Sequence, residues 1–149
     1  MKERNWHIPD PDVQPEFYAD VPLKRLLAWL VDTLVILGLS LVIVVFTAFT
    51  GLLVWPILLL VVGFIYRTAT IANGSATPGM RLFAIEFRTL DGARLDLPLA
   101  LMHTLGLTIS FGFIILQVIS VILMMTSARG QGLSDLVLGT IAVNRRAAQ

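Results

Sequence analysis

The feature that most constrains this chain is an apolar stretch from Pro22 to Thr47, which is long enough to cross a lipid bilayer. A hydrocarbon core of about 30 Å needs about 20 apolar residues in a helix. The stretch nevertheless carries Asp32 in its interior and Arg25 near its start. A charged side chain inside a membrane is costly and normally faces a partner, water or a functional site. The sequence therefore predicts an integral membrane protein whose first helix has a charged face.

A second span follows after a short turn. The segment from Leu26 to Tyr66 is almost free of charge and is long enough for two helices. Thr50-Gly51 supplies a break, and Trp55-Pro56 is typical of an interfacial anchor near the start of a helix. We therefore predict an antiparallel pair of transmembrane helices at about 22–47 and about 53–70.

The third apolar segment, Leu97–Ala128, leaves two alternatives open. It has no charge when its histidine is neutral, and it is longer than one span but shorter than two. A continuous helix at about 97–126 would align His103, Ser110 and Gln117, spaced by seven, in one polar seam. A break near Ser110 would instead give two short helices that enter the membrane and return to the same side. The charge distribution favours this broken or re-entrant arrangement.

The basic residues predict the topology. They occur before the first helix, after the second and near the C-terminus, and the turn between the first two helices has none. Positively charged loops stay in the cytoplasm, so we expect a multi-pass protein of the plasma (inner) membrane with both termini cytoplasmic. The residues are Lys2, Arg4, Lys24, Arg25, Arg67, Arg81, Arg88, Arg94, Arg129, Arg145 and Arg146.

Shorter elements flank the apolar segments. Residues 1–20 hold three prolines among acidic residues and are expected to form a flexible cytoplasmic tail before a membrane domain at 21–149. Asp91-Gly92 predicts a hairpin turn within a β element at about 81–96, and 139–145 is another strand candidate. Since a two-stranded hairpin is marginal alone, we expect the C-terminal segment to join it as a third strand, with Leu82–Arg88 and Thr140–Asn144 side by side. The predicted fold is an all-α integral membrane protein with a small cytoplasmic β-hairpin or three-stranded element.

Composition and motifs exclude several classes of function. A net charge of +1 without a basic stripe gives no case for a nucleic-acid partner. The absence of cysteine excludes disulfides, thiolate metal ligands and cysteine nucleophiles. The glycines form neither a dinucleotide-binding motif nor a P-loop, and no nucleophile–base or metalloprotease pattern occurs. We therefore expect no enzymatic activity, no metal and no cofactor.

The candidate functional cluster consists of Arg25, Asp32 and Asp135. Arg25 and Asp32 share a helix face about 10 Å apart along the axis, and we expect them to be coupled directly or through water. Asp32 is either a proton or cation site, or part of a polar staple that fixes helix packing. Asp135 lies in an expected short helix, Ser134–Leu138, where it either caps backbone N–H groups or pairs with Arg25.

His103 and Gln117 are secondary candidates. Histidine is the side chain whose ordinary pKa lies closest to neutrality, which suits a proton site. A lone histidine on an apolar helix more often packs or forms a hydrogen bond, and a glutamine there suits an interhelical hydrogen bond. Both structural and functional roles therefore stay open for these two residues.

The chain resembles the RDD family of small membrane proteins, named for one arginine and two aspartates. The matching residues are Arg25 and Asp32 in KRLLAWLVD, and Asp135 in RGQGLSDLVLGTIAV. The segment ATPGMRLFAIEFRTLDG is similar to the family's threonine-proline-glycine segment and its following turn. The resemblance runs from about Pro22 to Arg146.

Three positions depart from the family's usual pattern. Ser134 stands where many relatives have histidine, Met80 where a basic residue is common, and His103 where arginine is frequent. If those basic groups bind an anion or a proton in relatives, these departures imply weaker binding in this chain.

The resemblance implies transport of an ion or small ligand through the Arg/Asp cluster, since transport has been suggested for the family and some relatives are linked to cation/proton exchange. The alternative is a non-catalytic accessory or assembly subunit that docks on a larger membrane complex. The expected partners are the lipid bilayer and either further copies of the chain or that complex. A transporter needs a water-filled path past Asp32, whereas an adapter does not.

Overall fold

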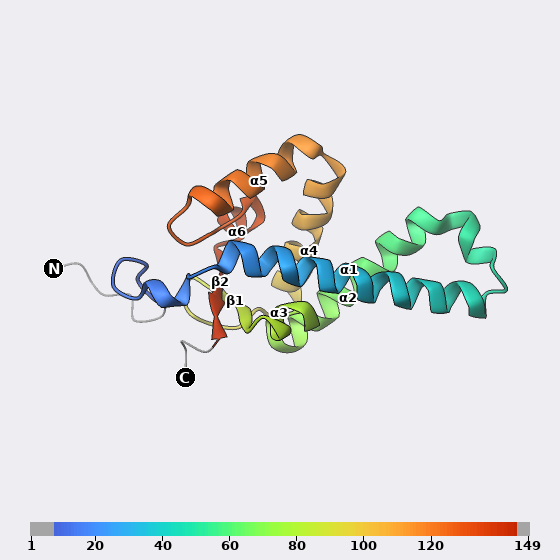
Figure 1. The fold of residues 1–149 in the computed structure, drawn as a ribbon, viewed down its shortest axis with the longest axis horizontal. Helices are drawn as coiled ribbons and strands as arrows, with labels where there is room; N and C mark the ends of the chain where they lie inside the picture. Colours follow the sequence, from blue (N-terminus) through green and yellow to red (C-terminus); the bar gives the residue numbers. More distant parts are fainter. Residues whose placement is uncertain (1–7, 146–149) are drawn as a thin grey trace.

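A computed structural model describes residues 8–145 of the chain. Its two longest helices, α1 (Val21–Phe46) and α2 (Trp55–Gly74), run antiparallel and are joined by the 3-10 turn η2 (Thr50–Val54) (Figure 1). Each begins with proline in its first turn, where the missing N–H removes no helix bond. Both helices are long and apolar enough to cross a membrane, which confirms the predicted pair.

The second helix is longer than the sequence indicated. It continues past the predicted end at about residue 70 and ends only where Ser75 adopts a left-handed conformation with φ 55°. The turn-forming sequence Asn73-Gly74-Ser75 thus ends the helix, and nothing before it interrupts the helical pattern. Arg67 consequently lies on a span-capable helix.

The third apolar segment is broken. Helices α4 (Leu97–Gly112) and α5 (Ile114–Thr126) are bent by 118° at Phe113, whose backbone is extended (φ −126°, ψ 102°). At 1.5 Å per residue the two helices measure about 24 and about 20 Å, so neither crosses a core of about 30 Å alone. The break falls next to the predicted weak point, and the segment is not one continuous helix.

Two short strands form the only sheet in the described part of the chain. β1 (Ile85–Thr89) pairs antiparallel with β2 (Thr140–Asn144), and Phe87 lies opposite Ala142. The prediction of a hairpin or three-stranded element is therefore wrong: the sheet joins two distant parts of the chain, and no third strand occurs within residues 8–145.

The reason lies in the segment after β1. A turn does form at Asp91, where the N–H of Gly92 donates to the carbonyl of Thr89 at 2.9 Å. The N–H of Leu95 then donates to the Ser75 hydroxyl at 2.6 Å, so this segment is held at the end of α2 and adds no strand to β1.

The described residues before α1 lie against β2. The amide of Asn144 donates to the backbone oxygens of Glu16 and Ala19 at 2.8 and 2.9 Å, and Lys24 donates to the same side chain at 2.7 Å. The start of α1 and the end of β2 are therefore at the same end of the molecule (Figure 1). Residues 1–7 of the expected tail lie outside the described residues.

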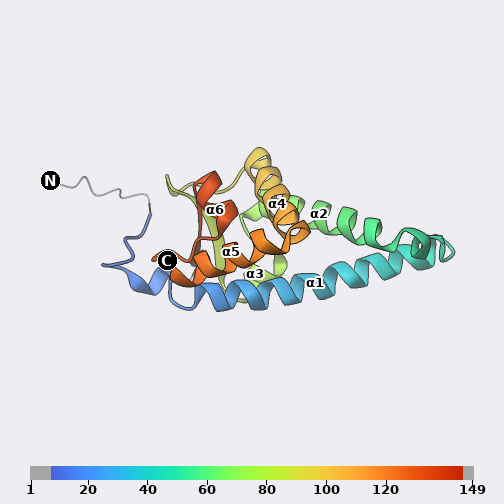
Figure 2. The same cartoon turned by 90° about the horizontal axis from the view of Figure 1, so that it is seen from above.

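The molecule has two ends of different character. At one end the sheet gathers with α3 (Pro78–Leu82) and α6 (Leu133–Leu138) into what we call the platform. At the other, the α1–α2 hairpin projects beyond the α4–α5 pair (Figures 1 and 2). The main core joins the platform to the inner halves of the helices, and its buried members are Val21, Ala28, Ile71, Ala76, Met80, Ile85, Phe87, Leu95, Ala100 and Ala142.

Candidate functional site

The carboxylate of Asp32 is buried and held by the threonine-proline-glycine segment. Its side chain is 1% exposed. One oxygen accepts hydrogen bonds from the Tyr66 hydroxyl and the Gly79 backbone N–H, both at 2.9 Å. The other oxygen accepts from the Thr77 hydroxyl. Asp32 therefore fixes the start of α3 against α1.

Each residue of that segment has a physical role. Thr77 is the N-cap of α3, since its hydroxyl accepts the N–H of Met80 at 3.2 Å, and Pro78 occupies the first helical position. Gly79 approaches α1 so closely that a Cβ there would lie 2.3 Å from the carbonyl oxygen of Ala28 and 2.8 Å from Asp32 Oδ1. Only glycine allows this contact.

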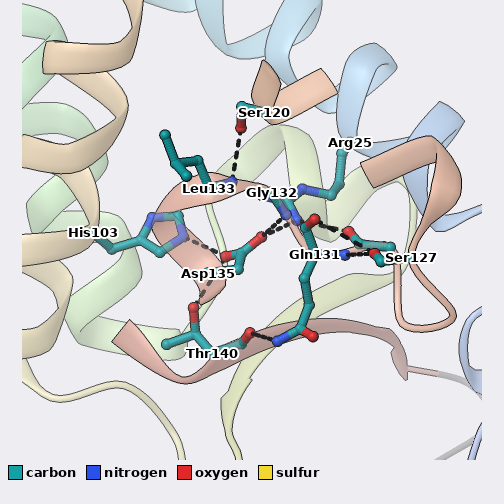
Figure 3. Close-up of polar contacts among 10 residues, drawn as sticks. Arg25, His103, Ser120, Ser127, Gln131, Gly132, Leu133, Asp135 and Thr140 are labelled. Carbon is teal, nitrogen blue, oxygen red and sulfur yellow. Dashed lines mark hydrogen bonds and ion pairs between the residues drawn. The ribbon is translucent and has the colours of Figure 1, made fainter. Parts of the chain in front are cut away.

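The carboxylate of Asp135 is the second acidic centre, and it is fully buried (Figure 3). The Arg25 guanidinium forms an ion pair and a hydrogen bond with one of its oxygens. His103 Nε2 and the Thr140 hydroxyl lie 2.8 and 3.0 Å from the other oxygen. The Gly132 backbone N–H donates to the carboxylate at 2.9 Å. The two alternatives for Asp135, capping α6 and pairing with Arg25, thus occur together.

These partners determine the charge state of Asp135. Burial alone would raise the pKa of its carboxyl, but the positive charge of Arg25 and the hydrogen bond with His103 outweigh burial and hold the pKa well below its usual range. The Asp135 carboxylate is therefore ionised under all ordinary conditions. A site that must gain and lose a proton near neutrality does not fit this residue.

Arg25 pairs with Asp135 and not with Asp32. Within residues 8–145 no hydrogen bond or ion pair joins Arg25 to Asp32, although the two share one helix. Arg25 also donates to the carbonyl of Gly130 at 3.3 Å and stacks over Phe87, 5.3 Å from the ring centroid. The predicted cluster is thus divided into two centres, one at Asp32 and one at Asp135.

The secondary candidates, His103 on α4 and Gln117 on α5, have different surroundings. His103 joins the Asp135 centre, and its ring packs on Phe87 at 4.4 Å between centroids. Gln117 lies on α5, and its buried amide oxygen has no hydrogen-bond partner in the described part of the chain. The His103 Nδ1 and the Thr104 hydroxyl are likewise buried without a partner there.

A pocket of about 700 Å³ lies between the inner half of α1 and the α4–α5 pair. This volume is within the range of small-molecule sites. The Trp29 and Phe111 rings stack at 5.5 Å on its wall. Most of the lining is apolar, and its polar side chains are Asp20, Arg25, Asp32, Arg67, Thr77, His103, Thr104 and Gln117.

Sequence reasoning missed Arg67 as a site residue. Its side chain is 14% exposed, and Nη1 lies 4.0 Å from Asp32 Oδ2. The predicted helix 53–70 includes it, but its charge was counted among the cytoplasmic basic residues because it directly follows the apolar run. The absence of a turn-forming residue before Asn73 was the available signal that the helix continues past it. Tyr66, its neighbour and a hydrogen-bond donor to Asp32, was also missed.

The described residues hold no group of three or more histidine, cysteine, aspartate or glutamate side chains that could bind a metal ion. Asp32 and Asp135 each receive several protein donors. What the arrangement offers chemically is a pair of hydrogen-bonded carboxylate centres beside a largely apolar pocket.

Two span-capable helices, a broken third apolar segment and a buried Arg–Asp pair define a small helical integral membrane protein. The chain belongs to the RDD family, whose model matches residues 20–139 and so includes Arg25, Asp32 and Asp135. No curated protein and no solved structure matches the chain significantly.

Proposed function

We propose that this protein moves a small ligand across the membrane and that the ligand binds in the pocket between α1 and α4–α5. The observation that carries the proposal is the pocket itself. It has the volume of a small-molecule site, a mainly apolar wall and a few polar side chains, among them Asp32 and Arg67.

The charged residues form two centres, one at Asp135 and one at Asp32, and this separation supports a different role for each centre. The Asp135 carboxylate has four hydrogen-bond partners, and through it the Arg25–Asp135 pair holds α1, α4, α6 and β2 together, which suits a structural staple. Asp32 and Arg67 lie on the pocket wall within the two spans, which suits contact with a ligand.

The proposed location is the plasma membrane, with the platform and both termini in the cytoplasm. The basic residues of the platform and its flanking segments support this orientation, because such residues are retained on the cytoplasmic side. The α4–α5 pair would then enter from the cytoplasmic side and return, since neither of its helices is long enough to cross.

Ligand-dependent thermal stabilisation tests the proposal. A ligand that binds only the folded protein raises its stability with concentration, so a panel of ions and small organic solutes can be screened on purified protein. Leu107 lines the pocket and Leu105 on the same helix does not. Leu107→Trp should abolish the stabilisation and the exchange of that ligand in proteoliposomes, whereas Leu105→Trp should preserve both. Equal behaviour of the two variants would contradict the proposal.

A non-catalytic assembly subunit is the second candidate, and the projecting α1–α2 hairpin favours it. Large apolar side chains at the end of this hairpin are exposed, including Phe46 at 86% and Leu53 at 87%. Such a surface suits lipid, a second copy of the chain or a larger complex. For an assembly subunit, Leu107→Trp should leave the function intact, while changes at the hairpin should alter the size of the complex in mild detergent.

A further inference from the structure

We infer that the ligand is an organic anion with an apolar body, and that Arg67 holds its anionic group. This inference rests on the proposed function, because it specifies the ligand of the same pocket. It concerns a carboxylate or phosphate as the charged group and an aliphatic or aromatic remainder.

Among residues 8–145, Arg67 has an ion-pair contact with Asp32 but donates no side-chain hydrogen bond. Its Nη1 is 4.0 Å from Asp32 Oδ2, which is beyond hydrogen-bond distance. Asp32 accepts its three hydrogen bonds from Tyr66, Thr77 and Gly79, and none of them comes from Arg67. Across residues 8–145 the guanidinium donates no hydrogen bond, although it has five N–H groups.

An unsatisfied guanidinium at this depth calls for an acceptor. Arg67 lies twelve residues after Trp55, the interfacial residue at the start of α2, and therefore about 18 Å along the helix. A cation inside a membrane is normally paired. Its planar fork matches the two oxygens of a carboxylate or phosphate, and the low dielectric strengthens that pairing.

The pocket's own carboxylates are Asp20, which is exposed before the start of α1, and Asp32, which accepts its hydrogen bonds from other groups. Arg25 and Asp135 neutralise each other, and Asp135 does not line the pocket. Arg67 is thus the pocket's cationic donor group that is not hydrogen-bonded within the described chain. Asp32 keeps the net charge near the guanidinium low, which allows an anion to be held and released.

The rest of the pocket lining indicates that the ligand has an apolar body. Large apolar side chains from α1, α4 and α5 surround the space around the guanidinium, and such walls are typical of sites for amphipathic ligands. They include Leu26, Trp29, Leu107, Phe111, Val121 and Met124.

Trp29 provides a reporter for the test because it lines the pocket. Trp6→Phe and Trp55→Phe leave it as the only tryptophan of the chain. The protein is placed in nanodiscs of neutral phosphatidylcholine and titrated with a dibrominated fatty acid, whose bromines quench fluorescence on contact. The matched probe is the fatty alcohol with the same brominated chain.

We expect saturable quenching by the acid, with a half-saturating concentration at least about tenfold below that of the alcohol. A charge-assisted hydrogen bond to Arg67 is strong enough to give a difference in affinity of this size. Arg67→Gln should remove this preference. Arg81→Gln, an equivalent change at an exposed arginine outside the pocket, should preserve it. The comparison of acid and alcohol on protein with native Arg67 needs no change at that residue, so it stays decisive if Arg67→Gln does not fold.

Other results separate this inference from the proposed function. Equal saturable quenching by acid and alcohol would overturn the anion inference and leave the pocket as a ligand site. No saturable quenching by either probe would overturn both. An anionic phospholipid with brominated chains identifies the source: quenching by it as well points to a bilayer lipid, and quenching by the free acid alone points to an organic acid.

Discussion

The backbone N–H of Gly79 lies 2.9 Å from the carboxylate of Asp32, so the turn after α2 is bonded directly to the middle of α1. This contact explains why a carboxylate can be buried in a span-capable helix. Three hydrogen-bond donors, from α2 and from the segment that starts α3, take the place of the water that would otherwise solvate the Asp32 carboxylate. The same contact explains the glycine, because any Cβ at position 79 would overlap α1.

Gly79→Ala should therefore destabilise the folded protein by about 3 kcal/mol, since it both overpacks the interface and displaces a hydrogen bond to a buried charge. The measurement is the free energy of unfolding, or the folded yield, in detergent. Gly38→Ala is the control, because a Cβ there meets nothing within 4 Å. Gly38→Ala should be neutral or stabilising by up to about 1 kcal/mol. Equal losses for the two variants would mean that the Gly79 contact is not made.

Arg25 should be energetically coupled to Asp135. Arg25→Ala or Asp135→Ala strands the remaining charge, at a cost of about 3–5 kcal/mol each, and the double variant should cost clearly less than the sum. A double-mutant cycle on unfolding free energies measures this coupling. The matched cycle of Arg25 with Asp32 should be additive within about 0.5 kcal/mol. Strong coupling in the second cycle and additivity in the first would contradict the assignment of partners.

The lowered pKa of Asp135 gives a pH dependence of stability. Because the folded-state pKa lies below the unfolded value of about 4, the unfolded state binds the proton first as the pH falls. The contribution of Asp135 should be fully present at neutral pH and decline below about pH 4. Thermal unfolding in detergent at a series of pH values measures this decline. Asp135→Asn should show a shallower loss over the same range, and an identical slope would count against the ionised, paired carboxylate.

The register of the sheet can be tested by cross-linking, because the chain has no native cysteine. Cysteines at Phe87 and Ala142 lie directly opposite each other and should form a disulfide, which needs Cα atoms less than about 7 Å apart. Cysteines at Ile85 and Ala142 are two positions out of register and should cross-link more slowly. A faster reaction for the second pair would shift the register by two residues.

Much of the fold could be predicted from hydropathy and turn signals. The lengths of the two apolar runs gave the spans, and Gly112 and its neighbours located the break in the third. The pairing of β1 with β2 was also expected. The strand expected after the Asp91-Gly92 turn was not found, because the Ser75 hydroxyl accepts the N–H of Leu95, and a single side-chain hydrogen bond of this kind cannot be recognised in a sequence pattern.

The site was less predictable. The sequence identified Arg25, Asp32 and Asp135 because charges in apolar surroundings are conspicuous. The pairing of cations with carboxylates depends on how α6 packs against α1, which the sequence does not show. Helix spacing indicated Asp32 as the partner of Arg25, whereas Arg25 pairs with Asp135. Arg67 was overlooked because it lies at the edge of an apolar run, where a helix end and a loop look alike.

If the protein is a transporter, the pocket beside Asp32 and Arg67 lies on a path across the membrane, and cysteine accessibility can detect such a path. A single cysteine replaces Leu107 in the pocket, and a membrane-impermeant thiol reagent is applied to intact cells and to inverted vesicles. Leu53→Cys on η2 and Val137→Cys on α6 are exposed reference positions at the two ends of the molecule.

Leu53→Cys should react only from outside and Val137→Cys only from inside. Leu107→Cys should react from both sides, and a ligand bound in the pocket should slow both reactions. Reaction of Leu107→Cys from the inside alone, with or without ligand, would contradict a transport path and favour the assembly subunit.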